Sequence, residues 1–190
     1  MLFDSHAHLD DRKFDSDRSE TIAAVQKSGV SCFVNIGADM ESSESSVALA
    51  EKYDFVYAAV GVHPYDAETV TDELIEKLRA MAQNKKVVAI GESGLDYHYE
   101  DADKQVQKNA FIKHIELANE LDMPVIVHNR DSHQDMMDIL REHKPKNAII
   151  HCYSGSAEMA KEIVKMGYYI SFSGTVTFKN ARKVQEAVAE

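Results

Sequence analysis

The sequence has few of the residues that mark disulfide scaffolds, linkers or membrane spans. Its 190 residues include two cysteines, Cys32 and Cys152, which are too few for a disulfide framework. The three prolines and eight glycines form no segment that would mark a domain boundary. The N-terminus lacks a basic segment followed by an apolar run, and no apolar stretch approaches the roughly 20 residues that cross a bilayer. We therefore expect one cytoplasmic domain over residues 1–190 with no membrane partner.

Positive charge is also scarce. The chain has 21 Lys and Arg against 32 Asp and Glu, a formal net charge of −11 at pH 7. This balance argues against a protein that wraps a long nucleic-acid duplex, because neutralising phosphates needs a positive surface. The excess of acid lies in residues 1–100, with 19 acidic and 9 basic residues, whereas residues 101–190 have 13 and 12. A local phosphate site remains compatible with this distribution.

Short apolar runs alternate with amphipathic segments along the chain, and hydrophobic residues make up 44% of it. The apolar runs are continuous rather than alternating, which is typical of parallel strands covered on both faces. We predict strands within residues 2–9, 32–36, 55–60, 87–90, 124–127, 148–150 and 168–171. We predict helices over about residues 17–28, 42–53, 71–82, 104–121, 132–142, 156–166 and 180–190.

Seven strand-and-helix units in succession predict an α/β fold, a TIM (β/α)₈ barrel. No Gly-rich loop follows the first strand, which argues against a dinucleotide-binding open sheet. The seventh helix is the last predicted element, so we expect the eighth strand to be missing from this chain. The two strand edges left unpaired predict a fragment, or a C-terminal segment supplied in trans. Apart from such a segment we expect no obligate protein partner.

The first predicted strand delivers two histidines separated by one residue. Because alternate side chains of a strand share a face, His6 and His8 point the same way. Two neutral imidazoles suit a divalent metal, which then needs ligands from elsewhere in the chain. Alone, the pattern also occurs in loops and at solvent-facing strand ends.

Further residues of ligand type follow three other predicted strands, and the carboxyl ends of barrel strands form one rim. One carboxylate among four imidazoles predicts two divalent ions, Mg²⁺, Mn²⁺ or Zn²⁺, because each carboxylate oxygen can take one ion. Counting back by twos from these residues predicts an inward face with Val88, Ile90, Ile126 and Ile149. The predicted metal ligands are His6, His8, Glu92, His128 and His151.

Several segments, in this order, closely resemble the TatD family of metal-dependent deoxyribonucleases: Phe-Asp-Ser-His-Ala-His-Leu-Asp, Gly-Val-His-Pro, Gly-Glu-Ser-Gly-Leu-Asp-Tyr, Pro-Val-Ile-Val-His-Asn-Arg and His-Cys-Tyr-Ser-Gly-Ser. The resemblance covers the whole chain. It implies an amidohydrolase-type TIM barrel in which His6, His8 and Glu92 bind a first ion. Glu92, His128 and His151 would bind a second. The family's remaining ligand, an Asp after strand eight, lies at a position that this sequence does not include.

The resemblance implies hydrolysis of DNA or another phosphodiester by a metal-activated water. The net negative charge and a pocket at the rim favour strand ends or single strands as substrate. Glu92 and His63 are the catalytic candidates. His63 follows the third predicted strand, where it could contact substrate or the leaving oxygen, although a turn histidine beside a proline is equally compatible.

Arg130 and His133 are the other substrate-binding candidates. Arg130 lies two residues after His128 and could contact a phosphate, although a salt bridge to Asp131 or Asp135 is the plainer interpretation. His133 follows the fifth strand closely enough to reach the rim.

Two other functions stay open at this point. Barrels of this type serve many chemistries, so the substrate could be a small amide, lactone or phosphoester. The carboxylated lysine of that wider group has no candidate at strand four, where Glu92 stands, which favours the TatD type. The third interpretation is an inactive metal-binding fragment.

Overall fold

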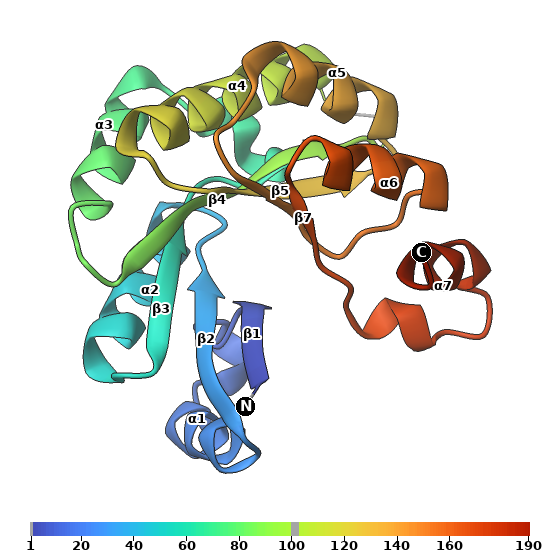
Figure 1. Ribbon diagram of the computed structural model, residues 1–190. Coiled ribbons are helices and arrows are strands. Elements are labelled where there is room, and N and C mark those ends of the chain that lie inside the picture. Colours follow the sequence, from blue (N-terminus) through green and yellow to red (C-terminus); the bar gives the residue numbers. More distant parts are fainter. Residues whose placement is uncertain (1, 100–102) are drawn as a thin grey trace.

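Seven parallel strands form one curled sheet, and the helices cover its convex face (Figure 1). The computed structural model describes residues 2–99 and 103–190. The strands are hydrogen-bonded in chain order: β1 (Leu2–Ala7), β2 (Val30–Ile36), β3 (Val56–Val60), β4 (Val87–Asp96), β5 (Val125–Arg130), β6 (Ala148–Ile150) and β7 (Tyr169–Ile170). The sheet is therefore a partly closed TIM-like barrel. Within the described residues it has no eighth strand, as predicted from the sequence.

The seven predicted helices are all present and lie close to their predicted ranges. They are α1 (Arg18–Lys27), α2 (Met40–Lys52), α3 (Asp72–Met81), α4 (Lys104–Leu121), α5 (His133–His143), α6 (Ala157–Lys165) and α7 (Arg182–Val188), with 3-10 turns η1 (Arg12–Phe14), η2 (Pro64–Thr69) and η3 (Gly174–Thr177). Side-chain caps explain several starting points. The side chains of Asp39, Thr71 and Ser156 accept hydrogen bonds from backbone N–H groups in the first turns of α2, α3 and α6. In the part of the chain described, no helix is both long and apolar enough to cross a bilayer.

The hydrophobic core has two layers, one on each face of the sheet. Along β2 and β5 the layers alternate residue by residue, because successive strand side chains point to opposite faces. Phe33 and Val127 belong to the large cluster that also contains helix residues, whereas Val34 and Ile126 belong to a small cluster on the other face. The small cluster fills the concave side of the sheet and supports the strand ends from below.

The predicted inward face is correct at Ile126 and wrong at Ile90. Ile90 packs in the large cluster, together with helix residues such as Phe111. The pairing of β4 with β5 shifts register between Ile90 and Ser93, and this irregularity breaks the alternation on which the prediction relied. Strand β4 also continues to Asp96, so Glu92 lies inside a strand rather than just beyond its end.

Candidate metal centre

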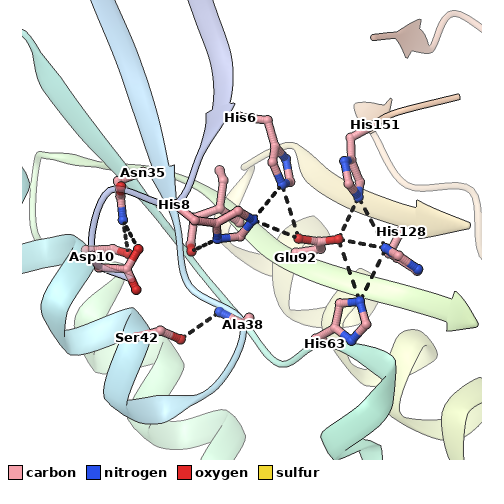
Figure 2. A network of polar contacts seen from close by, with 12 residues as sticks. His6, His8, Asp10, Asn35, Ala38, Ser42, His63, Glu92, His128 and His151 are labelled. Atoms are coloured by element: carbon pink, nitrogen blue, oxygen red, sulfur yellow. Dashed lines mark hydrogen bonds and ion pairs between the residues drawn. The ribbon is translucent and has the colours of Figure 1, made fainter. Parts of the chain in front are cut away.

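Five imidazoles surround the carboxylate of Glu92 at the carboxyl-terminal rim of the sheet (Figure 2). They come from β1 or its end, from the loop after β3, from β5 and from the end of β6, elements far apart in sequence that the parallel sheet brings to one rim. We call the five side chains the histidine cluster: His6, His8, His63, His128 and His151. Four of the five, all except His63, are the histidines predicted as metal ligands.

The two oxygens of Glu92 face different imidazoles. Its Oε2 lies 3.2 Å from Nε2 of His6 and 3.6 Å from Nε2 of His8. Its Oε1 lies 2.6 Å from Nε2 of His151 and 2.8 Å from Nδ1 of His128. The Glu92 side chain is only 4% exposed, so the carboxylate is shielded from water, whereas the His8 side chain is 42% exposed. This is the arrangement of a carboxylate that can bridge two cations.

Distances among the donor atoms give a second grouping. Two sets of three donors have all ligand atoms within 4.8 Å of one another: His6, Glu92 and His151 in one, and His63, Glu92 and His128 in the other. The two groupings differ in the place of His151, and the grouping by distance contains His63 but not His8. We prefer the grouping by Glu92 oxygens, because the 2.6 Å contact ties His151 to the oxygen that also faces His128.

His8 and His63 carry the ring proton on different nitrogens. Nδ1 of His8 lies 3.0 Å from the carbonyl oxygen of Ile36, which can only accept, so Nδ1 carries the hydrogen. Its Nε2 therefore presents a lone pair toward Glu92, the state that binds metal. In His63 the order is reversed, because Nδ1 accepts from the backbone N–H of Tyr65 at 3.2 Å. The neutral His63 ring thus presents an Nε2–H donor to the cluster.

Charges in the centre suit a cation. Burial alone would raise the pKa of Glu92, but hydrogen bonds from His128, His151 and His6 outweigh it and lower the pKa well below its usual value. Burial and the neighbouring His128 lower the pKa of His63 to about 4. An ionised carboxylate among imidazole nitrogens is a donor set that fits a divalent metal.

Asp96 is a site residue that the sequence analysis missed. Its side chain is 1% exposed, and its Oδ2 lies 2.9 Å from Nε2 of His128, on the opposite side of the ring from Glu92. The signal was present, because Asp96 lies four residues after Glu92 in the Gly-Glu-Ser-Gly-Leu-Asp-Tyr segment. The predicted strand ends at residue 90, which places that segment in a loop.

Arg130 and His133 lie outside the histidine cluster's network. Arg130 is exposed at the end of β5. Among the described residues it forms no salt bridge with Asp131 or Asp135, which pair with His98 and Lys108 instead. His133 begins α5, with Nδ1 2.6 Å from the amide nitrogen of Asn129. Within residues 2–99 and 103–190, neither side chain forms a hydrogen bond or ion pair with the cluster. Their roles toward substrate stay predictions.

A partly closed α/β barrel with imidazoles and a carboxylate gathered at its strand ends has the architecture of a metal-dependent hydrolase. The family model described as TatD related DNase matches residues 3–190, and the chain belongs to this family.

Relatives with sequence similarity are consistent with this assignment. The uncharacterized metal-dependent hydrolase YabD of Bacillus subtilis is 44% identical over 192 aligned positions, which cover 100% of this chain and 75% of that protein. The 3'-5' ssDNA/RNA exonuclease TatD of Cronobacter sakazakii is 37% identical, covering 92% of this chain and 67% of that protein. The chain therefore spans about two thirds to three quarters of these relatives.

Solved structures show the same fold. The crystal structure of YjjV, a TatD homologue from Escherichia coli K12, superposes with a TM-score of 0.92 at 32% identity. The superposition covers 100% of this chain and 74% of YjjV. A TatD family hydrolase from Entamoeba histolytica has a TM-score of 0.88 at 21% identity, which bears on the fold alone.

Proposed function

We propose that the protein hydrolyses phosphodiester bonds at the ends of single-stranded DNA, with two divalent ions held around Glu92. His6, His8 and Glu92 hold the first ion, and Glu92, His128 and His151 hold the second. The observation that carries the proposal is the division of the Glu92 oxygens between two sets of imidazoles. When bound, the ions lower the pKa of a water molecule and neutralise charge on the phosphate.

The donor set favours Zn²⁺ over Mg²⁺. Four of the five proposed ligands are imidazoles, which suit zinc and other transition metals, whereas Mg²⁺ prefers oxygen ligands and retains its waters. His8 is already in the required tautomer, because the carbonyl of Ile36 fixes its proton on Nδ1.

His63 acts on the substrate rather than on the metal in this proposal. Its Nε2–H points into the cluster, 3.3 Å from Nδ1 of His128 and 3.9 Å from Oε1 of Glu92. A neutral imidazole with its proton on this side is suited to donate a hydrogen bond to a phosphate or leaving oxygen. Arg130 and His133 are proposed as further substrate contacts at the rim.

Two observations support a single strand as substrate. The net charge of −11 argues against an extensive basic surface that follows a long duplex, whereas the end of a single strand can enter the rim by itself. In addition, the relative from Cronobacter sakazakii has the name of a 3'-5' ssDNA/RNA exonuclease.

The test is hydrolysis of a 5'-labelled single-stranded oligonucleotide with Mg²⁺, Mn²⁺ or Zn²⁺ in turn. We expect shortening by one nucleotide at a time, lost in Glu92→Gln and kept in the matched control Asp131→Asn, which changes an exposed carboxylate. A preparation that holds two ions yet leaves the oligonucleotide intact contradicts the proposal. Cleavage of a small amide, lactone or phosphoester by that preparation would then favour the wider amidohydrolase type.

A further inference from the structure

A hollow of about 480 Å³ opens beside the histidine cluster, between η2 and the start of α4. Pro64 and Tyr65 form one wall, and Pro64 directly follows His63 in the chain. Tyr99 and Val106 contribute to the rest of the lining. The volume lies in the range of small-molecule sites, and none of the proposed metal ligands lines the hollow.

Two exposed tyrosine rings form a row that starts at the ring of His63. The ring of Tyr65 lies 4.5 Å from the ring of His63, centroid to centroid, and 5.7 Å from the ring of Tyr99. Tyr65 is 49% exposed and Tyr99 is 55% exposed, so both keep ring surface open to a ligand. Aromatic rings in this position are suited to stack on planar groups.

The backbone of Tyr65 is anchored to His63. Its N–H donates to Nδ1 of His63 at the start of η2, and the two rings are in edge contact. Tyr65 therefore lies directly beside the proposed site of hydrolysis.

The far wall of the hollow is acidic. Glu68 is exposed there, and Asp103 uses one oxygen to accept from the N–H groups of Gln105 and Val106. Two carboxylates repel a phosphate, but they can accept hydrogen bonds from the amino group of a nucleobase. The hollow therefore suits a base and excludes the sugar–phosphate chain, which remains beside the histidine cluster.

We propose that this hollow binds a nucleobase of the substrate strand, stacked on Tyr65 and Tyr99, with Glu68 favouring bases that carry an exocyclic amino group. The inference rests on the proposed function and adds to it a base-binding subsite. Because stacking contributes to binding whether or not the bond is cut, affinity and hydrolysis can be measured separately.

The experiment measures binding of a phosphorothioate oligonucleotide and of the same strand with abasic residues at its 3' end. In Tyr65→Leu and Tyr99→Leu we expect about tenfold weaker binding of the base-bearing strand and unchanged binding of the abasic strand. Tyr65→Phe and Tyr99→Phe keep the ring and should keep the affinity, which separates stacking from a folding defect. The matched control is Tyr169→Leu, since Tyr169 is 67% exposed on β7 and lies outside the lining.

Amino-group recognition is tested with oligo-dC against oligo-dU, since uracil has a carbonyl oxygen where cytosine has its exocyclic amino group and neither base has a methyl group. The wild type should bind oligo-dC more tightly, and Glu68→Gln should remove the difference. Equal binding of both strands by the wild type overturns this part of the proposal.

The outcomes also separate this inference from the proposed function. One outcome is that the wild type shortens oligonucleotides while the leucine variants bind both strands as tightly as the wild type, or bind both strands more weakly by the same factor. The base subsite is then wrong and the proposed function stands. If the wild type neither binds nor shortens any oligonucleotide, both are wrong.

Discussion

Nε2 of His128 lies 2.9 Å from Oδ2 of Asp96. Its Nδ1 lies 2.8 Å from Oε1 of Glu92, and because carboxylates only accept, both ring nitrogens donate here. A cation would replace the proton on Nδ1, and Asp96 would keep the proton on Nε2. Burial alone would lower the pKa of His128, but Glu92 and Asp96 outweigh it and raise the pKa above its usual value. Asp96 thus orients the His128 ring and increases its basicity, as partners of metal-binding imidazoles do.

The first prediction concerns metal affinity in the variant Asp96→Asn. The amide can still accept the hydrogen bond from the backbone N–H of His98, so the fold is kept, but the negative charge beside His128 is lost. We expect the affinity for the second ion to fall about 10- to 100-fold, measured by calorimetric titration of the metal-free protein. Asp131→Asn serves as the control and should bind both ions normally. Equal affinities in the two variants would exclude this role for Asp96.

The second prediction concerns the number of ions bound. Because Glu92 is shared in the proposed centre, Glu92→Gln should lose high-affinity binding of both ions, whereas His8→Ala should lose one. Native mass spectrometry after metal loading gives the count directly, with two ions expected for the wild type. Two ions retained in Glu92→Gln would refute the shared carboxylate.

The third prediction concerns stability against pH and depends on His114. This histidine is fully buried in α4, where Nε2 accepts from the N–H of Val62 and Nδ1 donates to the carbonyl oxygen of Ala110. Burial lowers its pKa to about 4, from an ordinary value of 6.5. Between these values the unfolded chain binds a proton that the folded chain does not, so stability falls as pH falls.

The size of the effect can be measured by urea unfolding at pH 7 and pH 5. His114 should make the wild type lose about 2 kcal/mol between these two conditions, since each pH step of one unit below 6.5 costs about 1.4 kcal/mol. His114→Gln cannot titrate here, so its loss should be smaller by that amount. Parallel losses in the two proteins would show that His114 does not cause the dependence.

Much of the fold could be predicted from the sequence because its strands and its helices each have a strong local signal. Continuous apolar runs such as residues 124–127 fixed the strands, and amphipathic segments such as residues 104–121 fixed the helices. Since parallel strands end at one rim, His6, Glu92 and His151 could be expected to meet despite their distance in sequence. The structure does place these three side chains together.

What could not be predicted depends on irregular backbone and on contacts between elements. The register shift after Ile90 leaves no mark in the hydrophobic pattern, so both the orientation of Ile90 and the extension of β4 to Asp96 were missed. The hollow beside His63 needs η2 to pack against α4, a contact between segments with no shared motif. The tyrosines that line it, Tyr65 and Tyr99, are not among the site residues predicted from the sequence.

The fourth prediction tests how closely β4 must approach β5 at His128. Gly94 pairs with His128 and has a φ of +145°, a conformation that residues with a Cβ rarely adopt. A Cβ at this position would overlap the backbone carbonyl oxygen of His128. Gly94→Ala should therefore reduce the free energy of unfolding by about 1–3 kcal/mol, measured by urea denaturation.

The same substitution should also displace His128 from Glu92 and weaken metal binding. Gly174→Ala is the matched control, because a Cβ there meets no atom within 4 Å and the backbone does not have a positive φ. Its free energy of unfolding should stay within about 0.5 kcal/mol of the wild type, with metal binding unchanged. If Gly94→Ala were as stable as Gly174→Ala and bound metal equally well, the close approach of the two strands would not be what positions His128.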